Sequence, residues 1–199
     1  MAAQMMISDY LDVVVEPRYD SAIYLAAGSA LLTFFANPIG QGVGIFQANA
    51  VGAPKTLADT NMDLSGQLPG GYNFKLLGFR VMFGWNMSTQ DMQIILNAGV
   101  FTFTIGSKPF LRTCLRNIPA GNGPVGTAAT INTNGWPLLS NSYSIAKKPL
   151  DLLQTQNFQA TITFPGVAPV STTVGALSQN AAGLPITVML DGFLYRPVQ

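Results

Sequence analysis

Hydrophobic and polar residues alternate strictly between Phe158 and Phe164. This period of two is the side-chain period of a β-strand, in which successive residues point to opposite faces of a sheet. Aromatic and β-branched residues, which favour strands, fill most of these positions, and Pro165 closes the run. The pattern predicts a strand with Phe158, Ala160, Ile162 and Phe164 in a core, and with Gln159, Thr161 and Thr163 facing water or a neighbouring subunit.

Three further segments, 72–85, 100–105 and 185–196, alternate in the same way. In the third the alternation shifts at Asp191 and Gly192, which predicts a β-bulge. In the first, Gly78 marks a second bulge or a close backbone approach, and the face chosen for the core also carries Lys75, Leu77 and Trp85. The apolar positions of all these strands predict a core that includes Phe79, Val81, Phe83, Phe101, Phe103, Phe158, Ile162, Phe164, Val188 and Leu190.

One short stretch has a helical pattern. Ser88 or Thr89 can cap its start, Asp91 favours its first turn, and residues 97–99 can end it. Helical patterns do not alternate with strands elsewhere, so a parallel βαβ arrangement is not expected. The sequence predicts an all-β fold, either a sandwich or a barrel, with one short helix.

Residues 1–57 lack a long periodic pattern, and they are expected to form an N-terminal arm and extended segment ahead of a domain over residues 58–199. No charged residue lies between Asp20 and Lys55. The apolar run from Ala22 to Ala36 is shorter than the ~20 residues of a membrane-spanning helix, so a buried helix or strand pair is expected there. We expect the arm to bury its apolar surface mainly against other subunits.

The chain has few charges for its size. Charged residues make up 10% of the 199 residues and hydrophobic residues 48%, whereas about 25% charged residues is usual. Either the protein is a low-charge secreted β-protein or much of its surface is covered by other subunits, and the second interpretation is favoured because interface cores are depleted of charge. The side chains expected at such interfaces are Val13, Val14, Val15, Phe34, Phe35, Phe46 and Trp136.

The residues needed for catalysis or metal binding are scarce. There is no His, and Cys114 is the single cysteine. Asp59 and Asp63 have the spacing of oxygen ligands for calcium, but an EF-hand needs a later Glu and the only Glu is Glu16, so a solvated turn is favoured. Asp91, Asp151 and Asp191 are candidates for paired carboxylates, although solvated strand ends are favoured. The sequence predicts no enzyme activity, no cofactor, no metal and no small-molecule substrate.

Basic residues gather in the second half of the chain, although the net charge is only +1. Lys147 and Lys148 form a basic step that is expected to be a solvated strand end, with contact to a phosphate or an acidic partner as the alternative. Lys108, Phe110, Arg112 and Arg116 interleave bases with an aromatic residue, but nucleic-acid binding needs a wider positive field.

Three segments carry a resemblance to a known family. They are ADTNMDLSGQLP, FTFTIGSKPFLRTCLRNIPAGNG, and the closing pair LQTQNFQATITFP and VMLDGFLYRPVQ. Over roughly residues 58–199 the chain resembles the single jelly-roll coat proteins of tailless icosahedral bacterial viruses. The resemblance implies an antiparallel single jelly-roll sandwich of eight strands in two sheets, with loops and an arm that contact neighbouring subunits.

The same resemblance implies a structural coat protein that assembles with copies of itself into a capsid shell and is found in the virion. A second coat or penton protein, an internal membrane and the genome are further partners that it allows. The alternative is a carbohydrate- or receptor-binding β-sandwich such as a viral spike, for which Trp136 with Asn134 and Asn141 is the candidate cluster.

Overall fold

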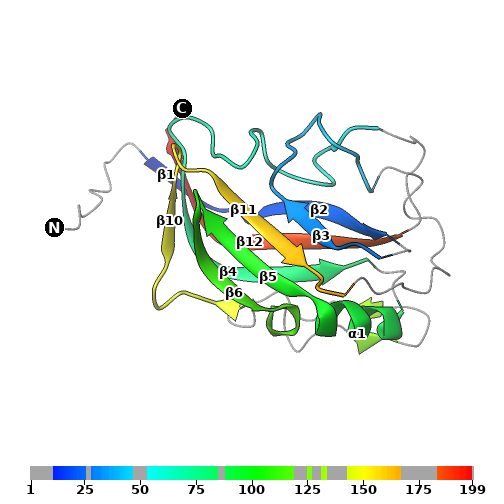
Figure 1. Ribbon diagram of the computed structural model, residues 1–199. Helices are drawn as coiled ribbons and strands as arrows, with labels where there is room; N and C mark the ends of the chain where they lie inside the picture. Colours follow the sequence, from blue (N-terminus) through cyan, green and yellow to red (C-terminus); the bar gives the residue numbers. More distant parts are fainter. Residues whose placement is uncertain are drawn as a thin grey trace.

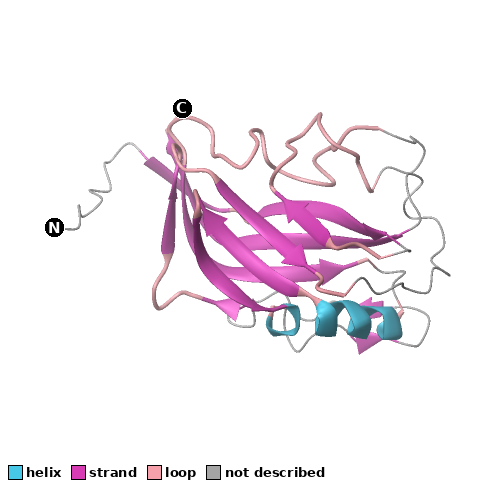
Figure 2. Ribbon diagram, in the orientation of Figure 1, coloured by secondary structure: helices cyan, strands magenta, loops and turns pink. Residues whose placement is uncertain are grey.

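A computed structural model describes residues 11–25, 28–46, 53–84, 88–118, 125–126, 131–133, 143–166 and 183–198. In this part of the chain two antiparallel β-sheets face each other and one helix lies at the end of the pair (Figures 1 and 2). The first sheet contains β1 (Leu11–Val15), β2 (Arg18–Leu25), β4 (Asn73–Phe83), β9 (Tyr143–Ser144), β10 (Leu150–Leu153) and β12 (Gly183–Pro197). The fold is an all-β sandwich.

The second sheet contains β3 (Leu31–Phe34), β5 (Val100–Ile105), β6 (Lys108–Cys114) and β11 (Phe158–Thr163). A separate ribbon pairs β7 (Val125–Gly126) with β8 (Ile131–Thr133). The helices are α1 (Thr89–Ala98) and the 3-10 turn η1 (Leu115–Asn117). In Figure 1 the strands β11 and β5 of the four-stranded sheet lie in front of β12 and β4 of the six-stranded sheet.

The strand pairs are nested along the chain. β2 pairs with β12, β3 with β11, β4 with β10, and β5 with β6, so each later pair lies inside the one before it. β12 also pairs with β4, and β11 with β5, which joins the nested pairs into two sheets. The chain therefore crosses between the sheets at most of its connections, and strands distant in sequence lie side by side.

The core between the sheets contains the side chains that the alternation predicts. All ten predicted core residues are buried, and none is more than 3% exposed. The ring of Phe79 on one sheet meets the rings of Phe101 and Phe103 on the other, with centroids 5.5 and 5.1 Å apart. Gln159 and Thr163 are exposed and Thr161 is half-buried, so the predicted register of β11 is confirmed.

A bulge is present at the predicted position, opposite Asp191 and Gly192, but its extra residue lies in β4, and the alternation of β12 continues without a shift. Asp191 is opposite Gly78 and Gly192 is opposite Leu76, so Leu77 is the extra residue of β4. Because of this extra residue, even-numbered residues of β4 face the core before the bulge and odd-numbered residues face it after the bulge. The first half of β4 therefore places Phe74 and Leu76 in the core. The prediction that Lys75 shares the buried face of Phe79 is therefore wrong, because the alternation was extended through the bulge. Trp85 lies outside the described residues.

The predicted helix is confirmed. The Oγ atom of Ser88 accepts a hydrogen bond from the N–H of Asp91 at 3.1 Å, which caps the start of α1. At the other end the N–H of Gly99 donates to the carbonyl of Ile95 at 2.9 Å. Met92 and Ile95 are buried against the core.

The segment expected to be an arm contributes two strands to the sandwich. β2 pairs along its whole length with β12, and β3 pairs with β11. Tyr24 is 1% exposed, and its ring packs edge-on against Phe164 of the opposite sheet at 4.7 Å between centroids. A domain boundary after residue 57 and an arm packed on other subunits are therefore wrong for residues 18–34. The apolar run 22–36 contributes to two strands, β2 and β3, which belong to different sheets and do not pair with each other.

Candidate functional site

The two sheets present different outer faces. On the six-stranded sheet several apolar side chains point outward. Val14, Leu194 and Phe74 lie side by side on three strands and point to the core side, so the residues next to them along each strand point away from the core. Val13 and Val15 of β1 are 47% and 78% exposed. We call this surface the apolar face; its apolar members are Val13, Val15, Tyr19, Ile23, Leu25, Met82, Met189, Phe193 and Tyr195, and Lys75 and the Arg80–Asp191 ion pair stand among them.

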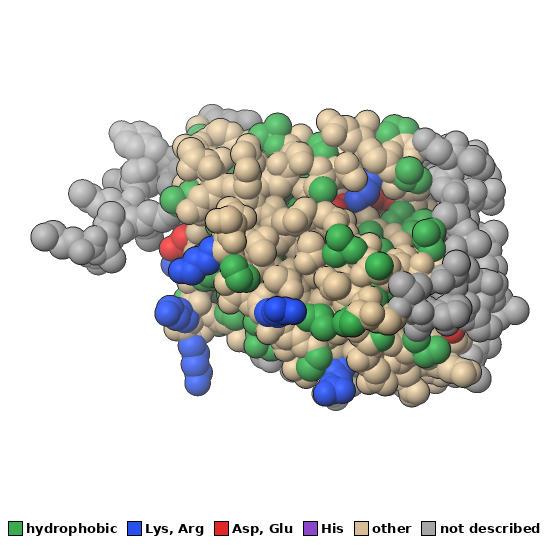
Figure 3. Space-filling view, viewed as in Figure 1, with side chains coloured by type: hydrophobic (Ala, Val, Ile, Leu, Met, Phe, Trp, Pro, Cys, Tyr) green, Lys and Arg blue, Asp and Glu red, His purple; other side chains and the backbone are tan. Residues whose placement is uncertain are grey.

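The outer face of the four-stranded sheet is polar by contrast. Thr161 of β11 lies between Thr33 of β3 and Thr102 of β5, and Gln159 lies opposite Thr104. Figure 3 views the molecule from this side and shows hydrophobic side chains scattered among polar and backbone atoms. A sheet with one solvated face needs only its inner face to be apolar. The apolar outer face of the other sheet thus exceeds what the sandwich itself requires, and such surfaces mark interaction sites.

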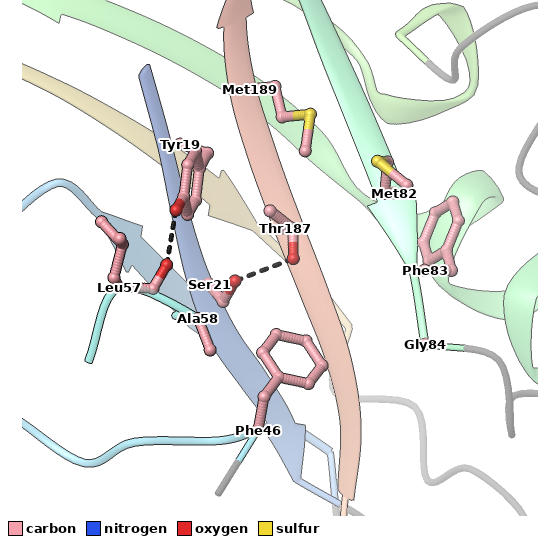
Figure 4. A pocket seen from close by; sticks show the side chains of 10 residues that line it. All are labelled: Tyr19, Ser21, Phe46, Leu57, Ala58, Met82, Phe83, Gly84, Thr187 and Met189. Atoms are coloured by element: carbon pink, nitrogen blue, oxygen red, sulfur yellow. Dashed lines mark hydrogen bonds between the residues drawn. The ribbon is translucent and has the colours of Figure 1, made fainter. Parts of the chain in front are cut away.

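A cleft of about 280 Å³ deepens the apolar face between the sheet and the loop that crosses it (Figure 4). Met82 and Met189 rise from neighbouring strands, and Phe46 and Leu57 come from the loop. The hydroxyl of Tyr19 donates to the carbonyl of Leu57 at 2.5 Å and fixes the loop on the sheet. Methionine side chains adapt to irregular shapes, so this cleft suits a protruding apolar group of a partner.

The polar groups in the cleft are satisfied and neutral. The hydroxyls of Ser21 and Thr187 form a hydrogen bond of 2.8 Å across β2 and β12. Burial raises the pKa of the Tyr19 phenol, and the carboxylates of Glu16 and Asp59 raise it further. Tyr19 therefore serves as a hydrogen-bond donor and not as a phenolate base.

A buried ion pair lies on the opposite side of β2 from the cleft. The Nζ atom of Lys55 is 2.5 Å from Oδ1 of Asp20 and donates to the carbonyl of Ser21 at 2.8 Å. The other carboxylate oxygen of Asp20 accepts from the N–H of Phe35 at 2.6 Å. Burial raises the pKa of Asp20 above its ordinary value, and the nearby Lys55 offsets part of that rise. This pair connects β2, β3 and the loop, so its role is structural.

Asp59 does not lie in a solvated turn, and that prediction is wrong. It is fully buried, and its carboxylate accepts from the N–H groups of Ile45 at 2.6 Å, Phe46 at 2.9 Å and Thr56 at 3.0 Å. Burial raises its pKa, but these hydrogen bonds lower it by more, and the net pKa is below the ordinary value. Asp63 is exposed, and no group of three or more potential metal ligands is found among the described residues.

The other candidate carboxylates are held on separate elements. Asp191 accepts two hydrogen bonds of 2.6 Å from Arg80, so it is part of an ion pair and not a solvated strand end. Asp91 is buried in the first turn of α1. Asp151 is exposed on β10. The described part of the chain does not bring these carboxylates together in one site.

The predicted interface residues have different positions. Val13 and Val15 belong to the apolar face, while Val14 shares the core side of Leu194. Phe46 is 39% exposed and lines the cleft.

Two of these predictions are wrong. Phe34 and Phe35 are 0% exposed, so they are core residues and cannot contact another subunit. Trp136, with Asn134 and Asn141, lies outside the described residues.

The sequence analysis missed Tyr19, Met82 and Met189 as surface residues. They stand at alternate positions opposite the core residues of their strands. For Met82 and Met189 the available signal is the alternation of residues 72–85 and 185–196, which turns both side chains away from the core. For Tyr19 the local sequence gives no such signal, because Arg18 and Asp20 occupy the inward positions of its strand.

Comparisons with protein-family models, curated proteins and solved structures find no match for this chain. Among the described residues no helix is long and apolar enough to span a membrane.

Proposed function

We propose that this protein is a structural coat protein whose copies assemble into an icosahedral viral shell. The observation that carries the proposal is the apolar face, on which the exposed side chains of Val13 and Val15 lie opposite Tyr195 and Phe193 of the neighbouring strand. Burying such a surface contributes roughly 25 cal/mol per Å² before the ordering costs of association are subtracted. Contact between copies would satisfy this surface without any ligand.

The strand pairing supports the fold implied by the proposal. A jelly roll is a pair of facing antiparallel sheets built from eight strands and two Greek keys. The nested pairs β2·β12, β3·β11, β4·β10 and β5·β6 provide eight strands in two sheets. Single jelly-roll coat proteins of tailless bacterial viruses, which the sequence resembles, are therefore the family proposed here, with the virion as the site of action.

The placement of charges supports a structural role over an enzymatic one. Asp20, Asp59 and Asp191 each hold a structural contact within the chain. A general acid or base must reach a substrate proton, and groups held in this way are not positioned for that step. We propose that the protein has no turnover and that its partners are copies of itself, with a second coat protein sharing the shell as an additional partner.

Assembly is tested by electron microscopy and light scattering of the purified chain. We expect closed particles or regular arrays at high protein concentration. Because the contacts are mainly apolar, particles should persist from low salt to about 1 M, where the Debye length is about 3 Å. Disassembly with rising salt would contradict apolar contacts, and a chain that stays monomeric at every concentration would overturn the coat proposal.

A further inference from the structure

The structure brings together two basic segments that are distant in sequence. A pocket of about 510 Å³ lies where β6 begins on one sheet and where residues 143–150 run along the other. Lys108 and Phe110 line it from β6, and Tyr143, Lys147, Lys148 and Leu150 line it from the second segment. A volume in this range is typical of sites for small organic ligands.

The charge of this pocket is entirely positive. Among the described residues that line it there is no Asp or Glu. The ion pairs found in the described part of the chain use Arg18, Lys55, Arg80 and Arg196, so none of them neutralises the pocket lysines. Lysine side chains that converge on a concave surface produce a focused positive potential, which attracts anions. In Figure 3, Lys and Arg side chains without neighbouring acids spread over the lower part of the view.

Apolar groups provide the rest of the lining. Phe110 is 43% exposed, and the Nζ atom of Lys108 lies 5.4 Å from the centre of its ring. Tyr143 and Leu150 are half-buried against the core. The aromatic ring of a ligand can stack on Phe110 while an anionic group of the same ligand reaches the lysines. A ligand with only one of these two groups would not use the whole pocket.

We propose that this pocket binds an amphipathic organic anion, namely an aromatic ring that carries a phosphate or carboxylate group. Lys108, Lys147 and Lys148 hold the anionic group, and Phe110 and Tyr143 hold the ring. The proposal is independent of the coat function, because it concerns the junction of β6 and β10 and not the apolar face.

The test measures binding of phenyl phosphate by isothermal titration calorimetry to the full chain and to two variants. The first variant combines Lys108→Gln, Lys147→Gln and Lys148→Gln, and it removes the positive charges of the pocket. The second, Lys75→Gln, Arg112→Gln and Arg116→Gln, removes the same number of positive charges outside the pocket lining. We expect the first variant to lose about tenfold or more in affinity and the second to lose much less.

Simpler ligands separate the two parts of the site. Inorganic phosphate and benzyl alcohol should each bind more weakly than phenyl phosphate. Phe110→Ala should reduce phenyl phosphate binding and leave phosphate binding unchanged, because the ring has no role with the bare anion. Thermal unfolding of each variant checks that a loss of binding does not come from a loss of folding.

Three results would overturn the proposal. Equal losses in the two charge variants would show a general effect of net charge. Binding of phosphate as tight as that of phenyl phosphate would remove the role of the ring. Binding of a single-stranded oligonucleotide without any binding of phenyl phosphate would identify a surface for polyanions and not this pocket.

Discussion

Asp59 and Asp20 are both buried, but their environments shift the two pKa values in opposite directions. At Asp59 the hydrogen bonds to the carboxylate outweigh the effect of burial and lower the pKa. The carboxylate therefore stabilises the fold above pH 3.8, and this stabilisation is lost as the pH falls through the pKa of the folded state. Burial outweighs Lys55 at Asp20 and raises its pKa, so stability from this group is greatest below pH 3.8 and declines as the pH rises through the folded pKa.

Replacing Asp59 by Asn tests the first of these assignments. The variant keeps the shape of the side chain but removes the charge that accepts from Ile45, Phe46 and Thr56. We expect a loss of about 1.5–3 kcal/mol in the free energy of unfolding at pH 7, which is typical of hydrogen bonds to a charged group. Chemical denaturation should show that the difference shrinks as the pH falls below 3.8. A difference that stays constant down to pH 2 would contradict the assignment.

Gly192 of β12 is required where β12 faces the bulge of β4. A Cβ atom at this position would lie 2.0 Å from the carbonyl oxygen of Lys75 and 2.8 Å from the ring of Phe74. We expect Gly192→Ala to destabilise the protein by roughly 2–3 kcal/mol, because the paired strands must move apart. Gly166→Ala is the matched control, since a Cβ there meets no atom within 4 Å. Equal melting temperatures for the two variants would show that the bulge tolerates a side chain.

Single residues differ in how well the sequence predicts them. The burial of Phe158, Ile162 and Phe164 follows from strict alternation, because only one face of their strand can reach the core. The burial of Asp59 could not be predicted, because its N–H donors at Ile45 and Phe46 approach only after the loop has folded. Nothing local in the sequence around Asp59 shows these contacts.

At the scale of elements, β1 and β2 form one interrupted edge strand. β1 pairs with the last residues of β12 and β2 with the residues before the bulge, in one continuous register. The interruption at Glu16 and Pro17 faces Asp191 and Gly192, where proline does not remove a ladder hydrogen bond. Beyond β2, the N–H of Asn61 donates to the carbonyl of Tyr19 at 3.3 Å and covers part of the edge.

Two deletions distinguish the contribution of the N-terminal residues to stability from the contribution of this edge strand. Removing residues 1–10 leaves β1 intact, so we expect no change in the free energy of unfolding. Removing residues 1–20 also removes β1 and Asp20, and it leaves Lys55 buried without its counter-ion. Loss of one partner of a buried pair costs about 3–5 kcal/mol. Guanidinium unfolding should separate the two deletions clearly, and equal midpoints would contradict the structural role of β2.

The elements also differ in how well they could be predicted. β5 and β11 alternate cleanly, and α1 has a capping residue, so their positions follow from the sequence. The first half of β2 is not predicted as a strand, because Arg18 and Asp20 stand at inward positions, which resembles a polar solvent-exposed segment. Their burial depends on Lys55 and Asn61, which come from a later loop.

At the scale of the whole molecule, the two outer faces of the sandwich suit different surroundings. Threonines and Gln159 stand on the outer side of the four-stranded sheet together with Leu31 and Val100, and Val15, Met189 and Phe193 belong to the opposite side of the sandwich. The low charge content of the sequence favours a covered surface but does not identify it, because the strand pairing decides which side chains stand together. The central claim is that copies of the chain associate through the apolar face.

The most direct test is sedimentation velocity of two charge-adding variants over a range of protein concentrations. Val15→Lys places a charge on the apolar face, and Thr163→Lys places the same charge at an exposed strand position on the polar face. We predict that the wild-type chain and Thr163→Lys form large assemblies, whereas Val15→Lys remains small because the buried charge lacks a partner. Assembly of Val15→Lys at wild-type concentrations, or its loss in Thr163→Lys alone, would contradict the account.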